Sequence, residues 1–114
     1  MLTRYRVVMA SRDLIHLAGR ALAEAAGEDS KVILFGSYAR GEERSDSDLD
    51  FLVIGPGVED RLGESARLGR LVGERGVPAD VVVVSEDYVS EWGALPGTML
   101  YDALTEGQVV GRAA

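Results

Sequence analysis

Apolar positions near the start of the chain recur with the period of a helix. The repeat begins after Ser11, a residue type that favours helix N-caps, and ends at Gly27, which is typical of a helix stop. Residues three or four apart lie on one face of a helix. The pattern therefore predicts an amphipathic helix with Leu14, Ala18, Ala21, Leu22 and Ala25 on its buried side.

Three shorter apolar runs have the length and composition of strands. Residues 31–35 and 48–54 are rich in Val, Ile, Leu and Phe, and a glycine-containing break follows each of them. Residues 81–84 are four consecutive valines, opened by Asp80. Because a strand that is apolar at every position is typically buried on both faces, we expect this third strand at the centre of the sheet.

The remaining segments predict further helices. Residues 58–75 carry an apolar stripe and are closed by Gly76 and Pro78. The members of the stripe are Leu62, Ala66, Leu68, Leu71 and Val72.

Ser85 can cap a short helix that contains Tyr88, Val89 and Trp92. A loop around Pro96-Gly97, a last helix through residues 99–104 and a last strand at residues 109–110 complete the chain. This order predicts an α/β fold, in which a small mixed sheet is flanked by helices.

Size and composition narrow the classes of function. The 114 residues are enough for one domain over 1–114, with no room for a second module. The chain has no cysteine, which excludes disulfides and thiolate chemistry, and its formal net charge of −7 argues against direct nucleic-acid binding. No apolar run approaches the ~20 residues of a membrane span and none resembles a signal peptide, so we expect a soluble, cytoplasmic protein.

Two aspartates stand where the second predicted strand begins. Asp48 and Asp50 are two residues apart, so their side chains should leave the strand on one face. At ~4 Å and an effective dielectric constant near 20, two carboxylates repel by about 4 kcal/mol. A divalent cation would remove that repulsion, and Mg²⁺ prefers such hard oxygen ligands. A solvated loop is the alternative interpretation.

A glycine-serine pair lies ten residues before these aspartates. Gly36 and Ser37 follow the first strand, where a short helix would begin, and free N–H groups there attract phosphate. The Ser37 hydroxyl can donate to a phosphate oxygen, and Arg40, one turn further on, could reach the same anion. A glycine-serine pair alone is more often a plain turn, so its value depends on the aspartates.

Asp80 is the third candidate, because it opens its strand much as Asp50 does. If the two strands are neighbours, Asp48, Asp50 and Asp80 converge in a cluster of the kind that a two-metal nucleotidyl-transfer site requires. Asp80 could then act as general base. Taken alone, it is more often a residue of a strand start. His16, the only histidine, is assigned no chemistry and is expected on the surface of its helix.

The order and spacing of these motifs resemble the minimal nucleotidyltransferase (MNT) domains of the DNA polymerase beta-like superfamily. The similar segments are GSYARG, DSDLDFLV, PADVVVVS and ALTEGQVV, in that order over nearly the whole chain. The resemblance implies a polymerase beta-like palm fold. It also implies that Gly36 and Ser37 hold the triphosphate of ATP, and that Asp48, Asp50 and Asp80 are the catalytic ligands of Mg²⁺, with two ions expected.

Stand-alone domains of this kind are commonly antitoxins. The resemblance implies a hetero-oligomer with a HEPN-type ribonuclease toxin, to which AMP is transferred from ATP on a tyrosine hydroxyl. Two alternatives remain open at this point: a non-catalytic antitoxin that blocks its partner sterically, and nucleotidyl transfer to a small molecule.

Overall fold

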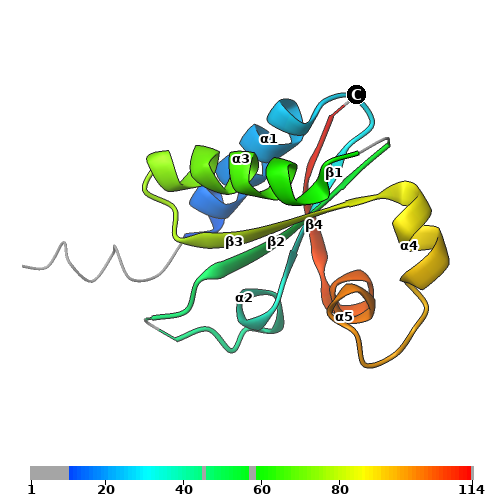
Figure 1. Ribbon diagram of the computed structural model, residues 1–114. Helices are drawn as coiled ribbons and strands as arrows, with labels where there is room; N and C mark the ends of the chain where they lie inside the picture. Colours follow the sequence, from blue (N-terminus) through cyan, green and yellow to red (C-terminus); the bar gives the residue numbers. More distant parts are fainter. Residues whose placement is uncertain (1–10, 45, 57–58, 114) are drawn as a thin grey trace, which may run out of the picture.

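A four-stranded mixed sheet forms the centre of the protein (Figure 1). The computed structural model describes residues 11–44, 46–56 and 59–113. The strand order is β3-β2-β1-β4; β1 is antiparallel to both of its neighbours, and β2 is parallel to β3. The strands are β1 (Lys31–Phe35), β2 (Leu49–Gly55), β3 (Ala79–Ser85) and β4 (Gln108–Arg112). The predicted mixed α/β fold is therefore confirmed.

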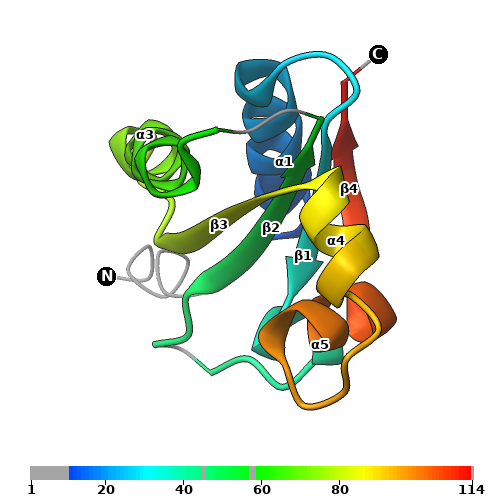
Figure 2. The same ribbon diagram turned by 45° about the vertical axis from the view of Figure 1, so that its right-hand side comes forward.

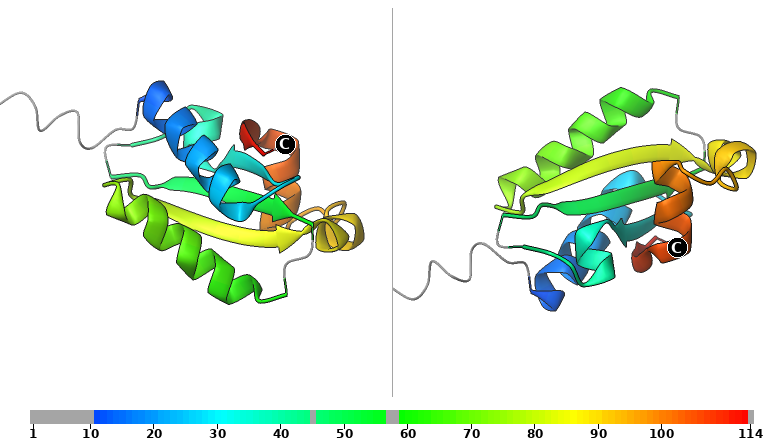
Figure 3. Two further views of the ribbon diagram at one scale, coloured as in Figure 1. Left: turned by 90° about the horizontal axis from the view of Figure 1, so that it is seen from above. Right: turned by 90° about the horizontal axis from the view of Figure 1, so that it is seen from below.

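Helices cover the two faces of the sheet in two groups. The long helices α1 and α3 lie across one face, and the short helices α4 and α5 lie on the other side (Figures 1 and 3). Helices α4 and α5 lie side by side there, as a second view also shows (Figure 2). The single turn α2 follows β1 at the end of the sheet, where Tyr38 and Ala39 pack against the buried residues of the α1 and α3 side. The helices are α1 (Arg12–Ala26), α2 (Ser37–Arg40), α3 (Arg61–Glu74), α4 (Glu86–Trp92) and α5 (Met99–Glu106). In the described part of the chain no helix is long and apolar enough to cross a bilayer.

The alternation of residues along β2 divides the core between the two faces. Leu49, Phe51 and Val53 pack with α1 and α3 in one apolar cluster, whereas Leu52 and Ile54 belong to a second cluster with α5. All five side chains are at most 5% exposed. Since successive side chains of a strand point to opposite faces, Asp50 must share its face with Leu52 and Ile54.

The helix ends follow the predicted capping chemistry. The Leu14 N–H donates to the Ser11 hydroxyl oxygen at 3.1 Å, and the Tyr88 N–H donates to the Ser85 hydroxyl oxygen at the same distance. Helix α3 begins at Arg61, later than predicted. The Asp60 carboxylate caps it by accepting a hydrogen bond from the Gly63 N–H. The predicted start at residue 58 lies outside the described residues.

The prediction that the valine strand lies at the centre of the sheet is wrong. Strand β3 is an edge strand, and β2 separates it from the rest of the sheet. Val83 and Val84 are buried, but Val81 and Val82 are only half-buried. The apolar run arises because β3 contacts α3 on one face and α4 on the other. Coverage of both faces by helices therefore does not require a central position.

The predicted stripe of α3 is only partly confirmed. Leu68 and Val72 are fully buried, whereas Leu62 is 80% exposed and Ala66 is also exposed. Six residues of an α-helix make roughly 1.7 turns, so Leu62 cannot share the face of Leu68. The buried apolar side chains of α3 come from its second half, whereas Ser65 in the first half accepts a hydrogen bond from the Val83 N–H at 3.0 Å.

Replacing these two leucines should separate core from surface. We expect Leu68→Ala to lower the free energy of unfolding by about 2–5 kcal/mol, because it leaves a cavity in the core. Leu62→Ala should change it by less than about 0.5 kcal/mol. Urea denaturation followed by circular dichroism measures both, and equal losses in the two variants would contradict the described packing of α3.

Candidate nucleotide and metal site

Three chain segments meet in one row across the sheet. The strand register pairs Phe35 with Asp50 across antiparallel β1 and β2, and Asp50 with Asp80 across parallel β2 and β3. Neighbouring strands are ~4.8 Å apart, so Asp50 has Asp80 beside it on one side and the end of β1 on the other. The two aspartate-bearing strands are thus neighbours, which is the condition under which the carboxylates can converge.

Asp50 and Asp80 lie on the side of the sheet that carries α4 and α5. Phe51 and Val81, the residues that follow Asp50 and Asp80, pack in the α1 and α3 cluster. Because successive side chains of a strand point to opposite faces, the two aspartates point to the other face. Asp50 is half-buried, whereas Asp80 is exposed. Asp48 is exposed too and precedes β2, so the sheet register does not fix its position.

Gly36 leaves space for the Asp50 carboxylate. Its backbone has φ 78° and ψ −155°, a conformation open to glycine but not to other residues. A Cβ atom built on Gly36 would overlap the Asp50 Oδ2 atom and stand 3.1 Å from Cγ. The absence of a side chain at Gly36 is therefore what allows the Asp50 carboxylate to lie directly against the turn.

Helix α2 is a single turn that starts at Ser37. The N–H groups of Ala39 and Arg40 donate to the Gly36 carbonyl oxygen at 3.1 and 3.2 Å, and the Glu42 N–H donates to the Ser37 carbonyl oxygen at 2.8 Å. The first N–H groups of a helix have no acceptor within it. The half-buried Ser37 thus offers a hydroxyl and a backbone N–H at the end of β1, next to Asp50.

Arg40 is held by two carboxylates in this structure. Its Nε atom lies 2.9 Å from Glu42 Oε1, and its Nη1 atom lies 3.5 Å from Glu106 Oε1 at the end of α5. The hydrogen bond to Glu42 is the main cause of a raised pKa of Arg40. Sequence reasoning placed Arg40 near a phosphate but missed Glu106, which is 66 positions away along the chain.

The environment of Asp50 disfavours its ionised form. Burial is the main cause of its raised pKa, and the charges of Asp80 and then Asp48 raise the pKa further, while Arg40 lowers it. The charges of Asp80, Asp48 and Arg40 therefore all act on Asp50. The negative charge at Asp50 is incompletely compensated by the protein itself.

The aspartates offer the carboxylate oxygens that Mg²⁺ prefers, but they do not by themselves complete its coordination shell. Among residues 11–44, 46–56 and 59–113, no group of three or more His, Cys, Asp or Glu side chains is arranged so that it could hold a metal ion. Mg²⁺ commonly takes one or two carboxylates and completes its shell with substrate phosphates and water. Asp50 and Asp80, which are neighbours in the strand register, fit that arrangement.

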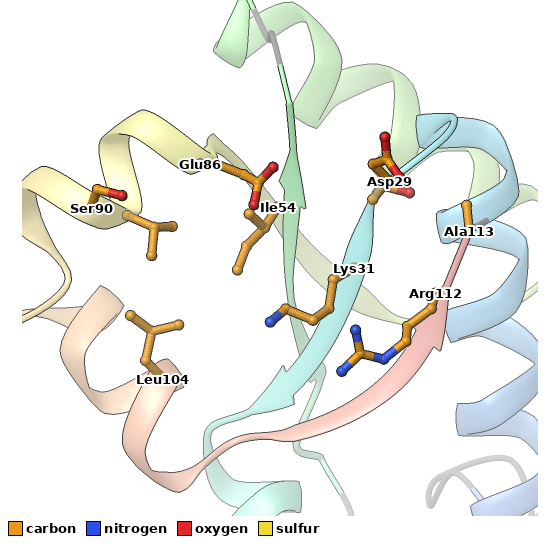
Figure 4. Close-up of a pocket in the computed structure, with 10 residues that line it drawn as sticks. Asp29, Lys31, Ile54, Glu86, Ser90, Leu104, Arg112 and Ala113 are labelled. Carbon is orange, nitrogen blue, oxygen red and sulfur yellow. The ribbon is translucent and has the colours of Figure 1, made fainter.

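A separate pocket lies at the opposite end of the sheet and was not anticipated from the sequence. It has a volume of about 490 Å³, and Figure 4 shows Lys31 and Arg112 extending into it from adjacent strands, with Glu86 of α4 across from them. Lys31 pairs with Ile54 in the register, four residues from the row of Asp50, which is roughly 13 Å along the strand. The pocket is distinct from the aspartate row.

Comparison with known proteins agrees with this geometry. Residues 19–104 match the family model described as nucleotidyltransferase domain. A Methanocaldococcus jannaschii protein named as a protein adenylyltransferase is 32% identical over 84 residues, which cover 74% of this chain and 80% of that protein.

Solved structures show the same fold at low sequence identity. A chain of a toxin–antitoxin crystal structure with AMP-PNP has a TM-score of 0.54 at 18% identity, covering 86% of this chain and 73% of its own length. A protein from Sulfolobus solfataricus named as a nucleotidyltransferase has a TM-score of 0.54 at 16% identity, with coverage of 96% and 90%. A chain of the complex of tri-AMPylated Shewanella oneidensis HEPN toxin with MNT antitoxin has a TM-score of 0.51 at 16% identity, with coverage of 90% and 74%.

The family model spans the turn at Gly36 and all three aspartates, and the fold brings Gly36, Asp50 and Asp80 close to one another. The chain therefore belongs to the nucleotidyltransferase domain family.

Proposed function

We propose that this nucleotidyltransferase is a Mg²⁺-dependent protein adenylyltransferase, which transfers AMP from ATP to a tyrosine of a HEPN-type ribonuclease partner and so acts as its antitoxin. The observation that carries the proposal is the row in which Gly36, Asp50 and Asp80 come together. It joins a turn suited to binding phosphate to two neighbouring carboxylates.

The relatives support the choice of acceptor. The Methanocaldococcus jannaschii protein is named for adenylyl transfer to protein. Two of the similar folds come from toxin–antitoxin structures, one with AMP-PNP and one with an AMPylated HEPN toxin. A protein acceptor also suits the exposed Asp80, because a hydroxyl on another protein can approach it from solvent.

Each residue then has a defined task. Gly36 and Ser37 bind the triphosphate through the backbone and the hydroxyl, and Arg40 contributes positive charge beside them. Asp48, Asp50 and Asp80 would hold two Mg²⁺ ions, which neutralise charge on the phosphates and the leaving group. The tyrosine oxygen forms a bond to the α-phosphorus, the bond to the β-phosphate oxygen breaks, pyrophosphate leaves, and Asp80 accepts the hydroxyl proton.

The transfer itself can be measured directly. Incubating the chain with ATP, Mg²⁺ and the protein encoded by the neighbouring gene should add AMP to a tyrosine of that protein, detected by mass spectrometry. Asp48→Ala and Asp50→Ala should abolish the adduct with the circular dichroism spectrum retained, because removing repelling carboxylates does not harm packing. Binding without any adduct in the wild type would instead favour a non-catalytic antitoxin.

Gly36→Ala should remove activity for a steric reason, because the added Cβ overlaps the Asp50 carboxylate and displaces it. Gly41→Ala is the matched control: Gly41 also has a positive φ, 71°, but a Cβ there meets open space. We expect the control to lose about 1–2 kcal/mol of stability from the left-handed backbone and to keep most of its transfer rate. Equal rates in the two variants would refute the proposed packing of Asp50 against Gly36.

The raised pKa of Asp50 predicts a cation-dependent stability. Between the ordinary pKa of Asp50 and its raised value in the fold, the folded chain binds more protons than the unfolded chain, so stability falls as the pH rises through this window. In metal-free buffer at neutral pH, Asp50→Asn should therefore melt at a higher temperature than the wild type. The difference between the two proteins should disappear below the ordinary pKa.

Mg²⁺ with ATP should raise the melting temperature of the wild type more than that of Asp50→Asn, because a ligand stabilises the state that binds it. Differential scanning calorimetry measures both effects. A wild type that is more stable than Asp50→Asn in the absence of metal would overturn this account of Asp50.

A further inference from the structure

The connection between α4 and α5 presents large apolar side chains to solvent. Trp92 is 47% exposed, Leu95 50% and Met99 44%, and all three lie within eight consecutive residues. Single exposed apolar residues are ordinary, but a group on one short connection marks an interaction surface. We call these three residues the α4–α5 patch.

The backbone under the patch is held in place by hydrogen bonds. The Gly93 N–H donates to the Val89 carbonyl oxygen at 2.8 Å, and the Leu95 N–H donates to the Trp92 carbonyl oxygen at 3.3 Å. The Thr98 hydroxyl donates to the Leu95 carbonyl oxygen at 2.9 Å and accepts from the Tyr101 N–H at 3.1 Å. A patch ordered before binding loses less entropy when a partner docks.

The two helices are also locked together beneath the patch. A Cβ atom on Gly93 would lie 2.8 Å from the Leu104 side chain, so α4 approaches α5 as closely as a glycine allows. The patch is therefore the exposed side of a rigid helix pair.

The chain segment that carries the patch is acidic, and the basic residues that reach it come from other elements: Arg61 of α3 lies over the Tyr88 ring, 4.7 Å from its centre, and Arg40 pairs with Glu106. Between Arg75 and Arg112 the sequence contains no Lys, Arg or His, although 12 Lys and Arg residues occur in the chain. Six of its 19 acidic residues fall in the same interval and account for most of the formal net charge of −7. They are Asp80, Glu86, Asp87, Glu91, Asp102 and Glu106, and all six are exposed.

The patch lies on the side of the sheet where the acceptor must arrive. Helices α4 and α5 lie on the face of the sheet to which Asp50 belongs, together with Leu52 and Ile54 (Figure 1). The ion pair between Arg40 and Glu106 links the end of α5 to the helix that follows the Gly36 turn. A protein that covers the patch therefore lies on the same face of the sheet as the aspartates, at the end where β3 leads into α4.

We propose that the α4–α5 patch is the docking surface for the acceptor protein, and that the occupant is a basic surface with an apolar recess for Trp92. This inference rests on the proposed function for its acceptor. Charge complementarity selects the partner. The carboxylates around the patch would repel an acidic surface and would not attract a neutral one. A ribonuclease has such a basic surface, since RNA binding depends on Lys and Arg.

Two pairs of variants test the surface. Trp92→Ala and Leu95→Ala remove the anchors, with Leu62→Ala as the control for an exposed leucine on α3, which lies on the opposite side. Glu91→Lys reverses a charge next to the patch, with Glu74→Lys on α3 as the control of equal net charge. Thermal melting of each variant verifies folding.

Binding is measured by calorimetry, without ATP, against the protein encoded by the neighbouring gene. We expect Trp92→Ala and Glu91→Lys to raise the dissociation constant roughly tenfold or more, and both controls to change it less than about twofold. Raising the salt concentration should weaken wild-type binding and have a smaller effect on Glu91→Lys. Wild-type affinity in both Trp92→Ala and Glu91→Lys, or no binding by the wild type, overturns the inference.

The test of the α4–α5 patch can fail or succeed independently of the test of AMP transfer. If the α4–α5 patch variants lose binding but the wild type forms no AMP adduct, the surface stands and the enzymatic proposal fails. If the adduct forms equally well with Trp92→Ala at subsaturating acceptor, the enzymatic proposal stands and the surface is wrong.

Discussion

The register of β2 is the constraint on which the rest of the site depends. A slip of one residue would move Asp50 to the α1 and α3 face and bury it among aliphatic side chains. Phe51 and Val53 prevent this, because they fill one face of the core while Leu52 and Ile54 fill the other. Burial of these four side chains therefore also sets the direction of a carboxylate that contributes nothing to the core.

Local signals in the sequence predicted the turn, the caps and the strand limits well. Ser11 and Ser85 are caps because their hydroxyls satisfy N–H groups within three residues, and such contacts can be read from neighbouring positions. The strand order cannot be read from neighbouring positions. A run of valines indicates only that both faces of a strand are covered, as in the edge strand β3. The pairing of Arg40 with Glu106 depends on how α5 returns over the sheet, which no local pattern contains.

The site is an unfavourable arrangement that the fold tolerates. Asp50 is partly buried and repelled by two other carboxylates, and among the residues that the structure describes only Arg40, itself shared between two glutamates, opposes this. Conflicts of this kind are expected where a protein has been shaped by function rather than by stability. The core on either side of the sheet is apolar and well buried, and so can offset the loss.

The contact between Gly36 and Asp50 has an entropic consequence. A carboxylate on an open strand end would sample several rotamers, and a ligand would have to select one of them on each encounter. Here the glycine turn confines the Asp50 side chain when the sheet forms, so folding has already restricted it before any ligand arrives. The smallest residue in the chain thereby limits the freedom of a neighbour across the sheet.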